Sequence, residues 1–344
     1  MLTPVSSELF FKGRPGDLRL GEWITGNSFE ESQCFALMGC PDDTGVLLNR
    51  GRAGAAQGPN EIRRAFYKMA FPMEGSWEGF SLKDFGNIDV SKDICSTHRK
   101  VYEASQFLSK STQGLILLGG GHDFAAPGFL GFISGRRFLN SKASFGLVNI
   151  DPHLDVRELE ENKPNSGTPF RQILESGEIQ GSHLIQFGCR ENRNSQTHFN
   201  FCKENQVQMV SLEKIRLKHP SSLHTFKQAV SPLMRKVTEL GVTLDMDSCS
   251  EVTGTSAAPG IGFSVSELYE IAYWVGTQTK VRYFEIAEVA PGLDPSGKTA
   301  LSAAELLYGF LLGRARSSLA SKNLGKNRIS NKTPKNSKKS HKRE

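Results

Sequence analysis

Residues 145–157, FGLVNIDPHLDVR, constrain the fold most strongly, because they join a largely apolar segment to a dense run of polar side chains. Phe145–Ile150 is a predicted strand. It is followed at every second position by Asp151, His153 and Asp155. If the extended conformation continues, these three side chains point to one face. Two neighbouring carboxylates repel each other and are costly to bury unless a cation lies between them. Such a run is also typical of a solvated polar loop, so its interpretation depends on residues elsewhere in the chain.

Other predicted strands end in the same kinds of side chain. Taken alone, each of these side chains can be explained by a structural role. A single histidine after a glycine turn, for example, is more often structural than a metal ligand. The residues are His122 after Leu115–Leu118, Asp245 and Asp247 after Val242–Leu244, and Glu285 and Glu288 within Tyr283–Val289. Separate structural roles do not explain why all of these residues are found near the ends of predicted strands.

Predicted strands alternate with predicted helices along the body of the chain. The expected strands are 35–39, 115–118, 145–150, 183–188, 207–212, 242–244 and 283–289. The expected helices are 98–110, 221–240, 265–275 and 299–316, together with one that begins near Pro59 and one within residues 165–175. This alternation predicts an α/β fold with a parallel, doubly wound sheet, in which ligands bind at the carboxyl ends of the strands. Two imidazoles and four carboxylates at that edge predict two divalent metal ions, and their oxygen-rich character favours Mn²⁺ over zinc held by thiolates.

Positive charge is concentrated at the C-terminal end. The chain has a net charge of +6, and residues 320–344 hold nine Lys or Arg against one Glu, which leaves the rest of the chain slightly acidic. A segment with so few apolar residues cannot bury a core, so we expect one folded domain over residues 1–319 and a disordered basic tail over residues 320–344. The tail could act as a nucleic-acid-binding arm, although no aromatic residue is interleaved for base stacking.

The cysteines and the apolar runs indicate a cytoplasmic protein. The six cysteines are scattered and form no CxxC pair, which is typical of reduced thiols and not of a disulfide framework. The sequence contains no apolar run long enough to span a membrane and no basic flank with an apolar core at its N-terminus. We therefore expect neither a membrane segment nor a signal peptide.

These motifs together resemble those of the ureohydrolases, the superfamily of arginases, agmatinases and formimidoylglutamases. GGGHD, NIDPHLD and LDMD match the three metal-binding motifs of that superfamily in order, EIAEVAP is similar to its substrate-binding segment, and the likeness covers nearly all of residues 35–315. It implies a three-layer α/β/α sandwich around a mainly parallel sheet, two Mn²⁺ per subunit and assembly as trimers or hexamers. The implied metal ligands are His122, Asp151, His153, Asp155, Asp245 and Asp247, and Glu288 is implied to hold the amidine group of the substrate.

Within this superfamily the chain is most similar to the formimidoylglutamases. Gly121 precedes the motif histidine where arginases carry Asp, and Arg157 stands where arginases carry a neutral Asn that contacts the substrate's α-carboxylate. The resemblance implies hydrolysis of N-formimidoyl-L-glutamate to L-glutamate and formamide, a step of histidine degradation, with Asp155 passing a proton to the leaving amine. A cationic Arg157 suits this doubly acidic substrate, but a structural salt bridge is an equally good reading of that residue.

The sequence also departs from the arginase pattern at two positions. Ser166 stands where arginases have a histidine thought to shuttle protons, and Ser250 replaces an outer aspartate of the third motif. Both changes count against arginase activity without affecting the implied metal ligands. Two other functions therefore stay open: an agmatinase or guanidino-acid hydrolase, and a non-catalytic metal-binding scaffold whose tail binds nucleic acid.

Overall fold

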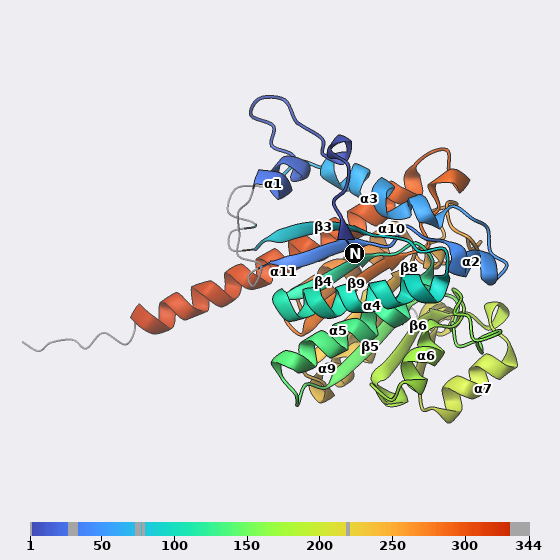
Figure 1. Ribbon diagram of the computed structural model, residues 1–344. Coiled ribbons are helices and arrows are strands. Elements are labelled where there is room, and N and C mark those ends of the chain that lie inside the picture. Colours follow the sequence, from blue (N-terminus) through green and yellow to red (C-terminus); the bar gives the residue numbers. More distant parts are fainter. Residues whose placement is uncertain (1, 27–33, 73–76, 78–79, 218–220, 331–344) are drawn as a thin grey trace, which may run out of the picture.

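The computed structural model describes residues 2–26, 34–72, 77, 80–217 and 221–330 (Figure 1). Within them, nine strands form one sheet in the order β1-β3-β2-β4-β9-β8-β5-β6-β7. Only the short edge strand β1 runs antiparallel to its neighbour, and all other pairs are parallel. The strands are β1 Leu2–Thr3, β2 Phe35–Gly39, β3 Leu82–Ile88, β4 Gly114–Leu118, β5 Phe145–Ile150, β6 Leu184–Cys189, β7 Gln208–Ser211, β8 Glu239–Asp245 and β9 Val281–Ala287.

Helices cover both faces of the sheet and give three layers. Figure 1 shows α4 and α5 on one face, with α9, α10 and α11 on the other. The helices are α1 Leu20–Gly26, α2 Thr44–Leu48, α3 Gly58–Tyr67, α4 Ile94–Ser111, α5 Ala125–Leu139, α6 Pro169–Glu175, α7 Gln196–Glu204, α8 Leu212–Leu217, α9 Ser222–Lys236, α10 Val265–Thr277 and α11 Lys298–Ser330. This architecture confirms the predicted α/β/α sandwich with a mainly parallel sheet.

The central strands are apolar on both faces because each face meets a helical layer. In β4, Leu115 and Leu117 belong to the hydrophobic cluster under α4 and α5, whereas Ile116 and Leu118 belong to the cluster under α10 and α11. Successive side chains of a strand point to opposite faces, so a strand buried on both sides has no polar alternation. The continuous apolar runs in the sequence follow from this double burial.

Helix α5 was absent from the sequence-based prediction because its glycines and proline are unfavourable for helices. The structure shows why glycine is needed there. A Cβ atom at Gly131 would lie 2.3 Å from the carbonyl oxygen of Tyr102, and one at Gly135 would lie 2.4 Å from that of Gln106. Tyr102 and Gln106 belong to α4, so the glycines allow the two helices to pack backbone against backbone. Strand β3 was also not predicted, since its LKDFGNI sequence is only half apolar.

Two predicted helix ends differ from the structure. Helix α9 was expected to reach residue 240 but ends at Lys236, because residues 239–245 form β8. Pro232 was expected to break or kink this helix, but the helix continues through it to Lys236. Helix α11 continues to Ser330, beyond the expected start of the tail at residue 320. Extending an established helix costs little, since each added residue gains one hydrogen bond. Residues 331–344 lie outside the described part of the chain. None of the described helices is long and apolar enough to cross a membrane.

Candidate metal centre

A glycine turn at the end of β4 places His122 at the carboxyl edge of the sheet. The turn is closely packed, since a Cβ atom at Gly120 would lie 2.0 Å from the carbonyl oxygen of Asp42. Gly121 also donates a hydrogen bond to that carbonyl oxygen at 3.1 Å. The 3₁₀ turn His122–Phe124 follows directly and leads into α5. Glycine is therefore required here for close backbone contact, and the histidine after it is held rigidly.

Gly121 is further explained by the aspartate that follows His122. A Cβ atom at Gly121 would lie 2.4 Å from Oδ1 of Asp123, so this space is already occupied. The other oxygen of Asp123 lies 2.7 Å from Nε2 of His98 on α4, and the pair is buried. In this chain the acidic side chain thus comes after the motif histidine, and the position before it must be glycine.

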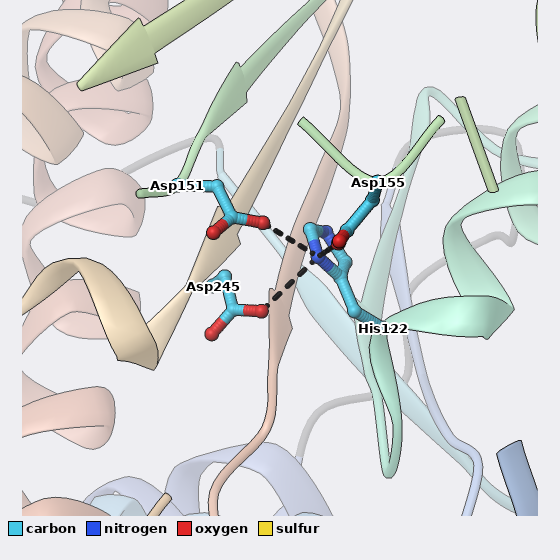
Figure 2. A group of neighbouring side chains, drawn as sticks. All are labelled: His122, Asp151, Asp155 and Asp245. Carbon is cyan, nitrogen blue, oxygen red and sulfur yellow. Dashed lines mark hydrogen bonds and ion pairs between the residues drawn. The ribbon is translucent and has the colours of Figure 1, made fainter. Parts of the chain in front are cut away.

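Three carboxylates converge on the His122 ring. Nδ1 of His122 lies 3.1 Å from Oδ2 of Asp151, of Asp155 and of Asp245 (Figure 2). A single ring nitrogen can donate at most one hydrogen bond, so this arrangement is not satisfied by hydrogen bonding. The ligand atoms of these four residues all lie within 4.8 Å of one another, as in a metal-binding group. One imidazole nitrogen and three carboxylate oxygens fit a hard or borderline divalent ion.

Asp151 connects this group to the two remaining candidate ligands. Its other oxygen, Oδ1, lies 3.3 Å from Nδ1 of His153, and the same nitrogen lies 3.8 Å from Oδ2 of Asp247. The two oxygens of Asp151 therefore face two adjacent groups. The structure brings all six candidate ligands to one region at the carboxyl ends of β4, β5 and β8.

The local geometry differs from the extended conformation expected from the sequence. Strand β5 ends at Ile150, and Asp155 has a φ angle of 47°, in the left-handed region. The loop is folded back by a hydrogen bond from the backbone N–H of His153 to Oδ1 of Asp151 at 2.7 Å. Asp247 likewise lies in a 3₁₀ turn, and its N–H donates to Oδ1 of Asp245 at 2.6 Å. The carboxylates converge because they shape their own turns, not because a strand continues.

Burial makes this cluster electrostatically demanding. Burial, together with the charge of Asp151, raises the pKa of Asp155 to about 6. Burial and the same neighbour hold the pKa of Asp245 well above its usual value. Burial opposes the charged form of His153, but the contact with Asp151 and the charges of Asp151, Asp155 and Asp247 together outweigh burial and raise the pKa of the ring to about 10. Without a cation, the cluster retains protons that a divalent ion would displace on binding.

Glu288 lies beside the cluster in a strained conformation. It follows β9 with a φ angle of 65°, and its Oε1 accepts a hydrogen bond from the backbone N–H of His122 at 2.9 Å. Burial and then the charge of Asp247 raise the pKa of Glu288 to about 8. Arg50, with a φ angle of 62°, and Asp155 are also left-handed, and all three residues line one cavity. Strain of this kind persists where the surrounding structure enforces it and is typical of functional sites.

The cavity above the cluster has a volume of about 510 Å³ and is polarised. Its buried end carries Asp245, Asp247 and Glu288, each only 2% exposed. Three arginines from three loops also line the cavity, and because two of them are exposed and Arg193 is only partly buried, they lie toward its open end. These are Arg50 after α2, Arg157 after β5 and Arg193 after β6. A ligand that fits this cavity has its reactive group at the acidic end and anionic groups at the basic end.

Arg157 is held at the cavity without a salt bridge to any described residue. Its backbone N–H donates to the carbonyl oxygen of Gly167 at 2.8 Å, and a Cβ atom at Gly167 would lie 2.6 Å from the Arg157 side chain. Ser166 also lines the cavity and accepts a hydrogen bond from Asn49 at 3.0 Å. Ser250 does not line the cavity; its backbone pairs with Phe263.

Arg50, Arg193 and His198 also line the cavity, although they were not among the site residues predicted from the sequence. Arg193 and His198 follow β6, so the rule that ligands bind at strand ends could have pointed to them. Arg50 lies in a loop that is far from the metal motifs in sequence. The stretch that contains it, LLNRGRAGAAQGPNEIR, resembles the formimidoylglutamases, but this likeness assigns no role to Arg50.

Comparisons with known proteins agree with this geometry. Residues 33–313 match the model of the arginase family. A formimidoylglutamase of Staphylococcus epidermidis is 31% identical over 290 residues, which cover 82% of this chain and 87% of that protein. A crystal structure of a Trypanosoma cruzi formiminoglutamase variant with Mn²⁺ is 26% identical and superposes with a TM-score of 0.78 over 87% of this chain and 99% of that one. The formimidoylglutamase of Bacillus subtilis is 27% identical, with a TM-score of 0.73 over 83% and 89% of the two chains. These matches confirm the resemblance inferred from the motifs.

Proposed function

The chain belongs to the arginase family, whose members hydrolyse C–N bonds of amidines, and from this premise we propose that its substrate is N-formimidoyl-L-glutamate. The products are L-glutamate and formamide. The observation that carries the proposal is the polarity of the cavity, with buried carboxylates at one end and three arginines at the other. The substrate has the matching polarity, because it joins a formimino group to two carboxylates.

The same polarity disfavours other amidines. Agmatine has no carboxylate and is positively charged at the end opposite its guanidinium group, so the arginines would repel it. A guanidino monoacid offers one anionic group to three cations. An amidine with two carboxylates uses the open end of the cavity most fully.

We propose that two Mn²⁺ ions are held by His122, Asp151, His153, Asp155, Asp245 and Asp247. Support comes from the unsatisfied convergence of three carboxylates on one nitrogen of His122 and from the oxygen-rich donor set. When bound, such ions lower the pKa of water and stabilise developing negative charge. Asp151, whose two oxygens face both groups, is positioned to serve both ions.

The protein side chains then bind and orient the substrate. Glu288 is fixed by the backbone N–H of His122, and its Oε2 makes no direct hydrogen bond within the described residues. That oxygen can accept hydrogen bonds from the formimino nitrogens and hold the reacting carbon over the cluster. Water adds to this carbon, and the bond to the glutamate nitrogen breaks. We assign Asp155 Oδ2 as the group that passes a proton from the water to the leaving amine.

Further proposals follow from the family resemblance and from the sequence. We propose that the enzyme acts in histidine degradation in the cytoplasm, supported by the absence of disulfides among its six cysteines. We also propose a homo-oligomer, a trimer or a hexamer, in keeping with the resemblance. Sedimentation of the purified protein tests the assembly directly.

An assay with a substrate panel tests the proposed function. Protein reconstituted with Mn²⁺ is incubated with N-formimidoyl-L-glutamate, agmatine, 4-guanidinobutyrate and arginine, and both formamide and urea are measured. We expect formamide from the first compound and little urea from the others. Urea released from a guanidino compound at a higher kcat/KM than formamide would instead identify a guanidino hydrolase. No product from any compound would favour a scaffold.

A further inference from the structure

We propose that Arg193 is a second specificity-determining residue, which binds the γ-carboxylate of the substrate while Arg157 binds the α-carboxylate. This inference rests on the proposed function and deepens it. The α-carbon carries the nitrogen of the scissile bond, so the α-carboxylate lies nearer the metal centre than the γ-carboxylate does. Arg157 follows the candidate ligand Asp155 by two residues, whereas Arg193 reaches the same cavity from the loop after β6.

The loop that carries Arg193 is fixed to the metal-binding loop. Arg193 ends a short 3₁₀ turn between β6 and α7, and Asn194 follows it. Oδ1 of Asn194 accepts a hydrogen bond from the N–H of Leu154 at 2.8 Å, and its Nδ2 donates to the carbonyl oxygen of Pro152 at 2.8 Å. Pro152 and Leu154 alternate with the candidate ligands Asp151, His153 and Asp155 in the sequence. Arg193 is therefore held at a set distance from the reacting end of the cavity.

Arg193 differs from the neighbouring arginine of the same loop. Arg190 is used structurally: its Nε lies 3.3 Å from Oε1 of Glu213, and it donates to the carbonyl oxygen of Ile261 at 3.3 Å. The Arg193 side chain is partly buried and lines the cavity, and within the described residues it forms no hydrogen bond or ion pair. A partly buried guanidinium without an acidic partner is costly unless an anion binds it.

Arg157 and Arg171 make the surroundings of His198 positively charged. His198 lines the same cavity, and its pKa is lowered by burial and then by the charges of Arg157 and Arg171. The imidazole therefore stays neutral and does not compete for an anion. Two arginines on separate loops can bind two separate carboxylates, which a single arginine cannot do.

Matched substrates can assign each arginine to one carboxylate. The Arg193→Gln and Arg157→Gln variants are each assayed with three substrates. The first is N-formimidoyl-L-glutamate. The second, N-formimidoyl-L-glutamine, lacks the γ-charge, and the third, 4-(formimidoylamino)butyrate, lacks the α-carboxylate. We expect Arg193→Gln to lower kcat/KM for the dicarboxylate by roughly 10- to 150-fold, because a charged hydrogen bond is lost. For the glutamine analogue, the same variant should change kcat/KM by less than about threefold. Arg157→Gln should show the reverse selectivity, sparing only the butyrate analogue.

An equilibrium measurement and a control separate this inference from the proposed function. Binding of glutarate, a five-carbon dicarboxylate, to the metal-loaded protein should weaken by a similar factor in Arg193→Gln. Lys203→Gln removes an exposed positive charge from α7 outside the cavity and should leave binding unchanged. Equal losses of Arg193→Gln on all three substrates, or unchanged glutarate binding, would overturn the role of Arg193. A wild-type enzyme that binds glutarate but does not release formamide would overturn the proposed function alone.

Discussion

At the scale of single residues, Arg157 is proposed to determine substrate specificity, and it does so from an exposed position. Its side chain is exposed and makes no salt bridge within the described residues, so the structure offers no stabilising role for its charge. We expect Arg157→Ala to lower kcat/KM for N-formimidoyl-L-glutamate by about 2–3 kcal/mol in transition-state terms, roughly 30- to 150-fold. Activity on agmatine should be unchanged or higher, and the midpoint of thermal unfolding should stay the same. A uniform loss on both substrates with a lower midpoint would indicate a structural role.

Backbone strain at Arg50 is a second feature at this scale. A left-handed conformation at a residue other than glycine costs roughly 1–3 kcal/mol, part of which glycine would recover. We expect Arg50→Gly to raise the free energy of unfolding by about 0.5–1 kcal/mol while lowering activity on the dicarboxylate, measured by urea unfolding and steady-state kinetics. Gln206, which also has a φ angle of 62° but lies outside the cavity, provides the control. Gln206→Gly should be stabilising without loss of activity, and an Arg50→Gly variant with full activity would show that the strain serves no function.

At the scale of secondary-structure elements, the contact between α4 and α5 depends on glycine. A methyl group at Gly131 would meet the backbone oxygen of Tyr102, which cannot move without shifting α4. We therefore expect Gly131→Ala to lower the free energy of unfolding by about 1–3 kcal/mol, despite the higher helix propensity of alanine. Because α5 begins directly after His122–Phe124, metal affinity should fall as well. Gly292→Ala is the control, since no atom lies within 4 Å of its added methyl group. A stabilised Gly131→Ala variant would show that the helices can separate at no cost.

At the scale of the whole molecule, metal binding and folding should be coupled through pH. Burial raises the pKa of Glu285 to about 7 and that of Glu288 to about 8, and Asp155 is raised to about 6. A carboxyl group with a raised folded-state pKa stabilises the fold fully below its unfolded-state pKa, and this stability is lost as the pH rises through the folded-state value. We expect the thermal midpoint of chelator-treated protein to decrease as the pH is raised from 5.5 to 8. With saturating Mn²⁺ the midpoint should be higher at pH 8 and should depend less on pH. A metal-free midpoint that rises over this interval would contradict the proposed electrostatics.

The C-terminal end gives the other prediction at this scale. Helix α11 packs against α10 and α3 along its N-terminal part, and its last turns project from the body of the molecule (Figure 1). We expect truncation after Ala320 to leave kcat/KM within about twofold, which is less than 1 kcal/mol. A large loss of activity would mean that the removed segment closes the site or builds the oligomer. Salt-sensitive retention of the full chain on nucleic acid, abolished by the truncation, would identify a binding arm.

The sequence by itself determined where the central strands lie in the chain, their parallel pairing and the place of the acidic residues at their ends, but not the order of the strands in the sheet. Apolar runs such as Phe145–Ile150 carry that information locally, because a strand buried on both faces must be apolar throughout. The sequence did not determine α5, since Gly131 lowers helix propensity and its benefit lies in a contact with another helix. It also did not reveal how Asp155 turns toward His122, because the left-handed turn is set by bonds across the loop.

Only the tertiary structure showed that Arg50 and Arg193 share the cavity with the acidic cluster and with Arg157, which the sequence had already indicated. Arg50, Arg157 and Arg193 are separated by more than thirty residues at each step along the chain, and no local pattern relates them. They meet because β5 and β6 are parallel neighbours, and because Ser166 and Asn49 join the loop after α2 to the loop after β5. Parallel strands bring their carboxyl ends to one edge whatever the length of the connection between them. Substrate specificity therefore depends on contacts distant in sequence, whereas the metal motifs are local and can be read directly.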